Sequence, residues 1–586
     1  MLTIYTMNKL TITLLATLFI LGACFDSDWK LVRKADSDTN ITFGILLKQN
    51  NTDMLNQMLD TISDPDSKMY GNYMTLEEIG MIVGIDYETK MELDIVNKYL
   101  GFNCSFMYDA YLCTASIQTV NKVFNVNMCI YENSQGKKLI RSNIDYVVPI
   151  EYGNYGSSID FIEGLSNNLF PIVNPKTVKT TDISVDPRYV GQESVNLMYN
   201  IGGVAGNSNI TVAAWEFMEG GFLQNYVIDS QLGNGVSPRN VTILVGPNGS
   251  NDIETELDLD EIANFGGINV GYGESNGWIV MGALQIQHLN ASVRPNVVSI
   301  SYGWSVYDQC TVVTCNNITS QQYVARADNE LKKLGLLGVS VLVSSGDAGS
   351  KGRTDEGCTT NRLDPDYPGS SPYVTSVGAT FNTQCSNEYN FTTSLCVNDS
   401  CSTCFANATV PVSFDYVEWT TGGGFAAQNF QSWQVGFTDE YLKSGVYLPN
   451  SSWNELGRGY PDVVMNGHNC PTYGVYGAGF AKIDGTSCSS PMFAGLVGLL
   501  NSHQLAKNRP MLGFLNPLLY KLASNYPAVF TPSAAGYTYC TEDMCCTPDE
   551  GFQTPPHSTK WNPVFGLGQP NFMKLIAALD DMFEMH

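Results

Sequence analysis

From about Ile183 onward, short apolar runs alternate with longer stretches whose apolar residues recur at helical spacing. The apolar runs have the length and composition of buried parallel strands: NITVAAWEF, VTILVG, VVSISYG and VSVLVSSGD. Between them lie IETELDLDEIANFGG and SQQYVARADNELKKLGLLG, which have helical periodicity. This alternation predicts an α/β fold with a doubly wound, mostly parallel sheet.

The N-terminal part of the chain predicts a smaller α/β unit over residues 25–150. In this unit Thr75 stands three residues before Glu78, which is a capping box that marks a helix start. Residues 151–182 contain Gly, Asn and Pro with little periodicity, so they predict a linker that holds the maturation site. The large α/β domain then covers residues 183–586.

Residues 1–24 have the pattern of a signal peptide. Lys9 precedes an apolar run that ends in the small residues Gly22, Ala23 and Cys24, and the run is short for a membrane span. No later run is long enough for an integral anchor. LGAC would also fit a bacterial lipoprotein, but twelve N-x-Ser/Thr acceptors favour the eukaryotic secretory route: Asn40, Asn50, Asn103, Asn209, Asn240, Asn248, Asn290, Asn317, Asn390, Asn398, Asn407 and Asn450.

Composition narrows the possible partners. Of the 586 residues, 44% are hydrophobic and 15% are charged, which excludes disorder as the main state. The net charge of -26 argues against nucleic acid or an anionic membrane as the main partner, because both require basic surface. An acidic protein suits an acidic compartment, where carboxylates become neutral, although solubility alone would also explain the charge.

The 16 cysteines predict disulfides, since the secretory pathway is oxidising. Loss of Cys24 with the signal peptide leaves fifteen, so at least one stays free or pairs between chains. Cys104 and Cys113 are close enough for a local bridge. Two further clusters lie near the C-terminal half: Cys385, Cys396, Cys401 and Cys404 in one, and Cys540, Cys545 and Cys546 in the other.

A candidate nucleophile lies in the segment DGTSCSSPMFAG, which starts at Asp484. Gly485 allows a tight turn, and Pro491 fits the first turn of a helix. Ser487 therefore precedes a buried helix N-terminus, where free N–H groups stabilise developing negative charge. A structural N-cap serine is the alternative, but the full G-T-S-x-S-x-P pattern favours a nucleophile.

A serine nucleophile needs a base, and none of the five histidines stands in a sequence context typical of a catalyst. A carboxylate is the alternative, and it acts near its own pKa of roughly 4. In IETELDLDEIANF, Glu254 and Asp258 fall on the apolar arc, whereas Glu256 and Asp260 fall on the opposite arc. We therefore predict Glu254 as the base, with Asp258 orienting it, and the other pair at the surface.

Asp347 in SSGDAG follows the apolar run VSVLV, so it lies at the carboxyl end of a strand, where ligands gather in open α/β sheets. A protonated aspartic acid there could donate a hydrogen bond to an oxyanion, which again requires acid. An ordinary Gly-Asp turn is the alternative.

Together, Glu254-x-x-x-Asp258, SSGDAG and GTSCSSP resemble the sedolisin family of serine-carboxyl peptidases. Further segments along nearly the whole chain resemble the same family: SDPDSKMYGNYMTLEE, SPYVTSVGATF, TGGGF, RGYPDVV, RPMLGFLNPLLY and NPVFGLGQPNF. The resemblance implies a subtilisin-like catalytic domain, an inhibitory prodomain and self-processing in acid near Thr181. The motif order is most similar to the tripeptidyl peptidases of the family, which implies release of tripeptides from free N-termini of peptides and unfolded proteins, in the lysosome or outside the cell.

The chain also departs from the family pattern. Cys488 follows the nucleophile where alanine is usual, and residues 382–409 form a cysteine-rich insertion. The family's calcium positions read Thr531 and Asn562, so both carboxylate ligands are missing and no cofactor is predicted. Disulfides of the C-terminal cysteines, with Cys358 as a partner, are expected to tie this region instead.

These features predict an acid-activated serine-carboxyl peptidase made as a zymogen, with its own prodomain as inhibitor. Two alternatives stay open: an endopeptidase of the same family, and a non-catalytic glycoprotein of the same fold. Retention of Ser487, Glu254, Asp258 and Asp347 argues against the second.

Overall fold

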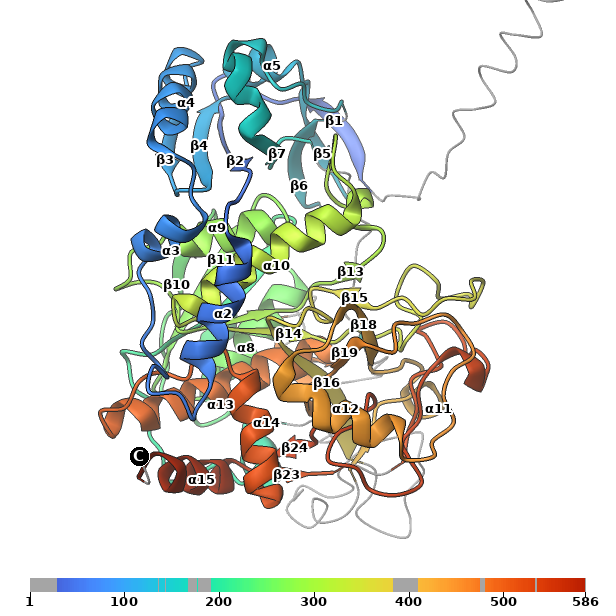
Figure 1. The fold of residues 1–586 in the computed structure, drawn as a ribbon. Coiled ribbons are helices and arrows are strands. Elements are labelled where there is room, and N and C mark those ends of the chain that lie inside the picture. Colours follow the sequence, from blue (N-terminus) through green and yellow to red (C-terminus); the bar gives the residue numbers. More distant parts are fainter. Residues whose placement is uncertain are drawn as a thin grey trace, which may run out of the picture.

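The computed structural model describes residues 29–134, 136–142, 144–166, 176–177, 191–382, 409–474, 480–532 and 535–584. The predicted signal peptide, the maturation region around Thr181 and nearly all of the cysteine-rich insertion lie outside these residues. A smaller N-terminal unit, blue to teal in Figure 1, sits on a larger domain that carries the rest of the chain.

The N-terminal unit contains two antiparallel sheets, in the strand orders β3-β4-β2-β7 and β1-β5-β6. Its strands are β1 (Lys30–Lys34), β2 (Asn40–Leu47), β3 (Asn103–Phe106), β4 (Ala110–Ser116), β5 (Met128–Glu132), β6 (Lys138–Ser142) and β7 (Ile159–Glu163). Its helices are α2 (Thr52–Ser63), α3 (Leu76–Val83), α4 (Tyr87–Tyr99) and α5 (Ile117–Phe124). The predicted capping box is present at α3, where Thr75 and Glu78 bond each other's backbone N–H groups.

The boundary predicted at residue 150 is too early. After the 3₁₀ segment η1 (Ile150–Ser158), β7 pairs with β2, and Ile159 and Phe161 are buried. The folded unit therefore includes much of the segment that was assigned to the linker. The Gly- and Asn-rich stretch before β7 concealed this short strand, which is stabilised by a partner more than 100 residues away in sequence.

The larger domain is built on seven parallel strands in the order β10-β11-β9-β12-β14-β16-β20, with β17 antiparallel to β16. Their bounds are β9 (Thr211–Phe217), β10 (Thr242–Val245), β11 (Asn269–Ser275), β12 (Val297–Ile300), β14 (Ser340–Ser344), β16 (Thr375–Asn382), β17 (Thr409–Pro411) and β20 (Val463–Asn466). The predicted α/β fold with a mostly parallel sheet after a smaller unit is confirmed.

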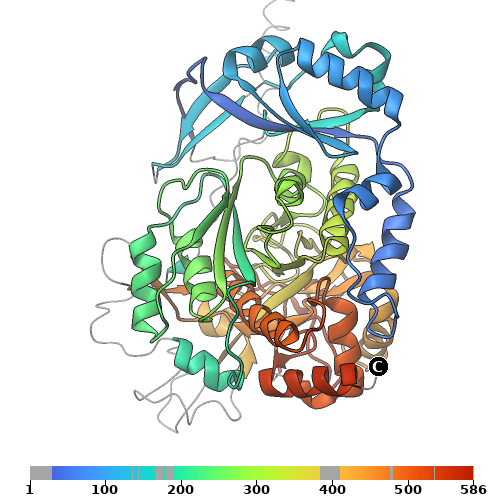
Figure 2. The same ribbon diagram turned by 90° about the vertical axis from the view of Figure 1, so that its left-hand side faces the viewer.

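Helices cover both faces of this sheet (Figures 1 and 2). On the face toward the N-terminal unit lie α9 (Ile279–His288) and α10 (Ser320–Leu336), and on the other face lie α8 (Ile253–Ala263) and α13 (Thr486–Ala506). Outer helices complete the domain: α6 (Gln192–Met198), α7 (Gln224–Gly233), α12 (Val435–Leu442), α14 (Asn516–Asn525) and α15 (Phe572–Glu584). α8 and α13 pack closely against each other, which brings two distant motifs together.

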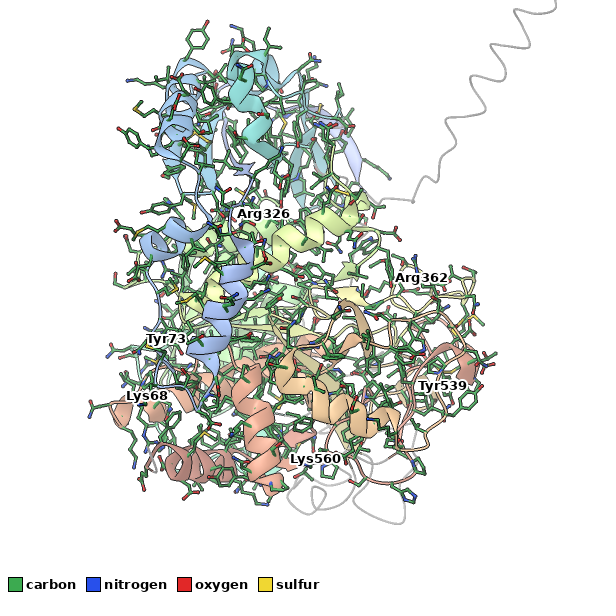
Figure 3. All side chains as sticks on the ribbon, in the orientation of Figure 1. Lys68, Tyr73, Arg326, Arg362, Tyr539 and Lys560 are labelled. Carbon is green, nitrogen blue, oxygen red and sulfur yellow. A yellow bond between two sulfur atoms is a disulfide. The ribbon has the colours of Figure 1, made fainter. Side chains whose placement is uncertain are left out.

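A buried ionic cluster joins the N-terminal unit to α10, at the junction where Figure 3 labels Arg326. Lys333 Nζ lies 2.9 Å from Asp109 Oδ2 and 2.6 Å from Glu330 Oε2. Arg326 bonds Glu330 at 2.8 Å and donates to the carbonyl of Asp109 at 3.0 Å. We call Asp109, Arg326, Glu330 and Lys333 the interface cluster; it contains two cations and two carboxylates.

Five disulfides are formed among the described residues. The predicted Cys104–Cys113 bridge is present, and Cys358 pairs with Cys546 as expected. The others are Cys310–Cys315, Cys470–Cys488 and Cys540–Cys545, and Cys129 is a free buried thiol.

Two observations bear on the secretory prediction. Nine of the twelve N-x-Ser/Thr asparagines lie in the described residues, and all nine are exposed, as glycan acceptors must be. Within the same residues, no helix combines the length and apolar character needed to cross a membrane.

Candidate active site

Ser487 is the second residue of α13 and is buried. Gly485 precedes the helix with φ 150°, a backbone conformation that would strain any side chain, so the glycine permits the tight entry. The backbone N–H of Ser487 belongs to the first turn of α13, where N–H groups have no helical acceptor. Pro491 lies inside the helix rather than in its first turn, which corrects the predicted start.

Glu254 occupies the first turn of α8, and its carboxyl group lies close enough to the Ser487 hydroxyl for that hydroxyl to lower its pKa. Burial raises the pKa of Glu254 well above its ordinary value, and the nearby charge of Glu216 raises it further. The Ser487 hydroxyl acts in the opposite direction. A base with a raised pKa beside a serine hydroxyl has the geometry for proton abstraction.

Asp258 lies one helical turn beyond Glu254 and is fully buried. The hydroxyl of Ser301 lies 2.8 Å from each of its carboxyl oxygens. Burial, followed by the charges of Glu216 and Glu254, raises the pKa of Asp258 well above its ordinary value. Glu254 and Asp258 therefore form a coupled pair in which a second ionisation is opposed by the first.

Two further carboxylates extend this pair, and sequence reasoning missed both. The hydroxyl of Tyr302 lies 3.0 Å from Glu216 Oε2, and the Thr255 hydroxyl bridges Glu216 at 3.3 Å to Asp252 at 3.1 Å. Burial raises the pKa of Glu216 to about 8, and the charge of Asp252 adds to this effect. Glu216 interrupts the apolar strand β9, and a carboxylate within a buried strand is the sequence signal that could have identified it.

The prediction that Glu256 and Asp260 lie at the surface is wrong, because the whole of α8 from Glu254 to Ala263 is buried. Glu256 accepts the N–H of Leu223 at 2.6 Å, and Asp260 accepts the N–H of Tyr473 at 2.8 Å. α7 and β21 (Cys470–Tyr473) cover the arc that was expected to face water. The two pairs nevertheless point in different directions, and Glu254 is the residue that lies close to the Ser487 hydroxyl.

Asp347 follows β14, as predicted, and lines the same small cavity as Ser487, Ser301 and Arg353. Its Oδ1 accepts the N–H of Thr486 at 2.8 Å and the Thr486 hydroxyl at 2.7 Å. Arg353 donates to Oδ2 at 3.0 Å. Asp347 thus holds the turn before the nucleophile, and in this structure it acts as an acceptor, whereas we expected a donor.

Four of the five histidines lie in the described residues: His288 and His557 are exposed, His503 is half-buried and His468 is buried. His468, the one buried near the turn, lies with Nδ1 2.5 Å from Asp484 Oδ2, while Asp484 Oδ1 accepts the N–H of Asn469. This pair supports the strand β22 (Phe480–Asp484) that leads into Ser487.

Cys488, which follows the nucleophile, is not a free thiol. It forms a disulfide with Cys470 in β21, and both residues are fully buried. The bond ties the first turn of α13 to the strand that packs on α8.

The segment between the two units passes next to this site. β8 (Lys176–Thr177) pairs antiparallel with β22, placing Thr177 opposite Ile483 and Lys176 opposite Asp484. Asp484 stands three residues before Ser487, so backbone of the predicted linker lies beside the nucleophile.

The residues at the family's calcium positions do not fit a calcium site. The side-chain oxygen of Asn562 accepts the N–H groups of Val564 and Phe565 at 3.0 and 3.3 Å, which closes a local turn. Thr531 is exposed on β23 (Phe530–Thr531), and Lys560 lies over the ring of Phe437. Neither Asn562 nor Thr531 supplies the carboxylate ligand that Ca²⁺ favours.

Two family models match this chain, and several known proteins are similar to it along most of its length. The pro-kumamolisin activation domain matches residues 27–168, and the subtilase family matches residues 239–512. Physarolisin of Physarum polycephalum is 31% identical over 595 residues, covering 96% of this chain and 99% of its own length. Human tripeptidyl-peptidase 1 is 26% identical over 595 residues, covering 94% of this chain and 93% of its own. Pseudomonas sedolisin, a serine-carboxyl proteinase of known structure, is 20% identical with a TM-score of 0.49 over 67% of this chain and 98% of its own.

The fold and these matches define a serine-type peptidase preceded by an activation domain. More particularly, the chain belongs to the sedolisin family of serine-carboxyl peptidases.

Proposed function

We propose that this protein is an acid-active peptidase that releases tripeptides from free N-termini, with Ser487 as nucleophile and Glu254 as base. The observation that carries the proposal is the proximity of Glu254 to the hydroxyl of Ser487, with Asp258 one turn behind on the same helix. Ser487 Oγ attacks the scissile carbonyl carbon while its proton passes to Glu254. The proton then reaches the leaving amine as the acyl-enzyme forms, and water completes the cycle with the same groups.

The oxyanion formed in this step needs donors. The N–H of Ser487 at the start of α13 is one, and the helix dipole adds to it. Asp347 is the proposed second, through a proton on Oδ2. Because Arg353 occupies Oδ2 in the zymogen, this role requires the Arg353 contact to open when substrate binds.

The acid requirement follows from the coupling of the carboxylates. The base must be ionised, but ionisation of Asp258 or Glu216 beside it would raise the pKa of Glu254 further. Acid keeps the neighbours neutral, so that a single negative charge can reside on Glu254. Departure of the prodomain readmits water and lowers these pKa values, because burial is their largest cause.

Maturation is proposed to occur in cis. The pairing of β8 with β22 lays Lys176 and Thr177 of the linker in the extended form in which peptidases bind substrates, next to the strand that leads into Ser487. Acidification of the purified precursor should yield the mature chain, and mass measurement would locate the new N-terminus. The Ser487→Ala precursor should be secreted but stay intact; processing of that variant in isolation would refute the assignment.

The number of residues released is tested with matched peptides. Peptides with a free N-terminal amine should be cleaved after the third residue, whereas N-acetylated copies should be cleaved poorly. Equal cleavage of both would favour the endopeptidase alternative. Delivery to the lysosome is proposed together with this activity, since the acceptors at the surface and the acid chemistry both suit that compartment.

A further inference from the structure

The hairpin of β5 and β6 reaches from the N-terminal unit toward the active site. Lys137, the residue immediately before β6, places its Nζ 3.0 Å from Asp252 Oδ2, and both side chains are about nine-tenths buried. The two ends of the hairpin loop are joined by a hydrogen bond, in which the Lys137 N–H donates to Asn133 Oδ1 at 2.9 Å. A lysine held this firmly in a protein interior requires carboxylate partners.

Asp252 contacts this ammonium group directly, and the charge of Lys137 also acts on three further carboxylates of the catalytic domain: Glu216, Glu219 and Glu274. We call these four carboxylates the acidic subsite. Lys137 lowers the pKa of Glu216, Glu219 and Glu274, each of which is raised chiefly by burial. Arg141 in β6 is the larger of the two cationic influences on Glu219. Both of these cations belong to the prodomain.

Two oxygens of the acidic subsite have no hydrogen-bond partner among the described residues. They are Glu216 Oε1 and Glu274 Oε2, and both residues are more than nine-tenths buried. Glu274 Oε1, by contrast, accepts the N–H of Glu219 at 2.7 Å. Unpartnered carboxylate oxygens in such a position are unfavourable unless a ligand reaches them.

Helix capping accounts for only part of this arrangement. Asp252 is the N-cap of α8, with Oδ1 accepting the N–H of Thr255 at 3.1 Å. The positive end of a helix dipole repels an ammonium group, so the cap alone would exclude Lys137. The additional carboxylates make the electrostatic potential at this helix end favourable for an ammonium group. A cap that only stabilised the helix would not need these additional carboxylates.

The acidic subsite adjoins the catalytic pair. Asp252 stands two residues before Glu254, and its charge acts on the pKa of both Glu254 and Asp258. An extended tripeptide spans at most roughly 10 Å, so an amine at its end and its scissile carbonyl fall within one such site.

We propose that the acidic subsite binds an ammonium group of the substrate through carboxyl oxygens that accept its N–H groups, which Glu216 can do in its neutral form as well, and that Lys137 occupies the subsite as an internal mimic in the zymogen. Departure of the prodomain removes Lys137 and Arg141 together and leaves the carboxylates for the substrate. Under the proposed tripeptidyl activity, on which this inference rests, the ammonium group is the free N-terminus. A lysine side chain offers the same chemistry, and the experiment separates the two sources.

The first test changes only the prodomain. Lys137→Met should make the zymogen mature about tenfold faster on mild acidification, because the hairpin loses its anchor. Lys138→Met is the matched control, since Lys138 is an exposed neighbour in the same strand. The mature enzymes have the same sequence, so their equal specific activity would verify folding. Maturation of Lys137→Met at the wild-type rate would overturn the mimicry.

The second test uses mature Glu274→Gln, which keeps the acceptor for the Glu219 N–H. Its KM should rise about tenfold for peptides with a free N-terminal amine and stay unchanged for their N-acetylated copies. Glu256→Gln, a buried carboxylate on the other arc, is the control, and Glu219→Gln is the second variant if Glu274→Gln fails to fold. If a folded variant keeps the wild-type preference for peptides with a free amine, the proposed subsite is wrong, whereas the proposed tripeptidyl activity is unaffected.

A third test, which separates the two sources of the ammonium group, uses N-acetylated peptides that contain an internal lysine. If wild type cleaves acetylated and free peptides equally, while Glu274→Gln selectively weakens those with lysine, the subsite stands with a side chain as its ligand. The tripeptidyl proposal would then fall.

Discussion

The two buried clusters of charge in this chain are built in opposite ways. The interface cluster balances Asp109 and Glu330 with Arg326 and Lys333. Around the nucleophile, carboxylates outnumber cations, and burial raises the pKa of Glu216, Glu254 and Asp258. At Asp109 burial also opposes the charge, but Lys333 and Arg326 more than offset it, so its pKa lies below the ordinary value.

This difference in charge balance distinguishes a cluster that stabilises an interface from a cluster that takes part in catalysis. A balanced cluster is satisfied as it stands, so it suits a permanent interface. A cluster with surplus carboxylates binds protons readily and exchanges them with neighbours, which general acid–base chemistry requires. The prodomain supplies the carboxylate Asp109 to the interface cluster but the cations Lys137 and Arg141 to the active-site side, so its removal takes away opposite charges at the two places.

The largest expected effect is at the base. Glu254→Gln should reduce kcat by about 10³-fold or more, because glutamine cannot accept the serine proton. Glu256→Gln should stay within about tenfold, since glutamine can still accept the Leu223 N–H. Steady-state kinetics of both mature variants measure the change in kcat. Equal losses would show that Glu254, on the arc nearer Ser487, matters no more for catalysis than Glu256 on the other arc.

Breaking the balanced cluster should come next. Asp109→Asn leaves two buried cations facing one carboxylate, which should destabilise the zymogen by about 3–5 kcal/mol. Urea unfolding of the secreted precursor measures the change, with exposed Asp145→Asn as control. Because Asp109 leaves with the prodomain, the mature enzyme should be unaffected; an unchanged midpoint for the precursor would mean that the cluster contributes nothing to the interface.

The disulfide beside the surplus carboxylates should matter for stability and little for chemistry. The double variant Cys470→Ala/Cys488→Ala should lose about 3 kcal/mol of unfolding free energy and keep its activity within a few-fold. Its control, Cys104→Ala/Cys113→Ala, removes a bridge of the prodomain, so the mature enzyme should unfold as wild type does. A loss of catalysis comparable to that of Glu254→Gln would instead place the bridge within the catalytic mechanism.

Acid should stabilise the mature domain. Burial raises the pKa of Glu261 from 4.5 to about 8, so the folded state binds this proton more tightly than the unfolded state does. Stability is therefore greatest below about pH 4.5 and falls as the pH rises toward 8. Glu261→Gln should flatten the dependence of Tm on pH between these values, whereas exposed Glu455→Gln should not. Parallel curves for wild type and Glu261→Gln would contradict the sign of this shift.

The smallest expected effect concerns a bound metal ion, whose positive charge would balance the surplus of carboxylates. Across the described residues, no group of three or more His, Cys, Asp or Glu side chains is arranged to hold a metal ion. Excess chelator should therefore leave the Tm and activity of the mature enzyme unchanged. Stoichiometric calcium in the purified protein, or a clear fall in Tm with EDTA, would disprove this.

The catalytic residues themselves could be chosen from the sequence because each lies in a short local pattern. Ser487 follows a Gly turn into a helix, Asp347 ends an apolar strand, and Glu254 and Asp258 share one helical arc. Such patterns depend on backbone periodicity within a few residues, which sequence reports directly.

Tertiary packing decided the rest. The burial of Glu256 and Asp260 depends on α7 and β21, the acceptor role of Asp347 depends in part on Arg353, and the pairing of Cys488 depends on Cys470 across two elements. The contact of Lys137 with Asp252 joins residues from separate units. Periodicity within one element gives the direction of a side chain, but what that side chain meets is fixed by segments far away in the chain, so burial, charge balance and pKa were settled only by the fold.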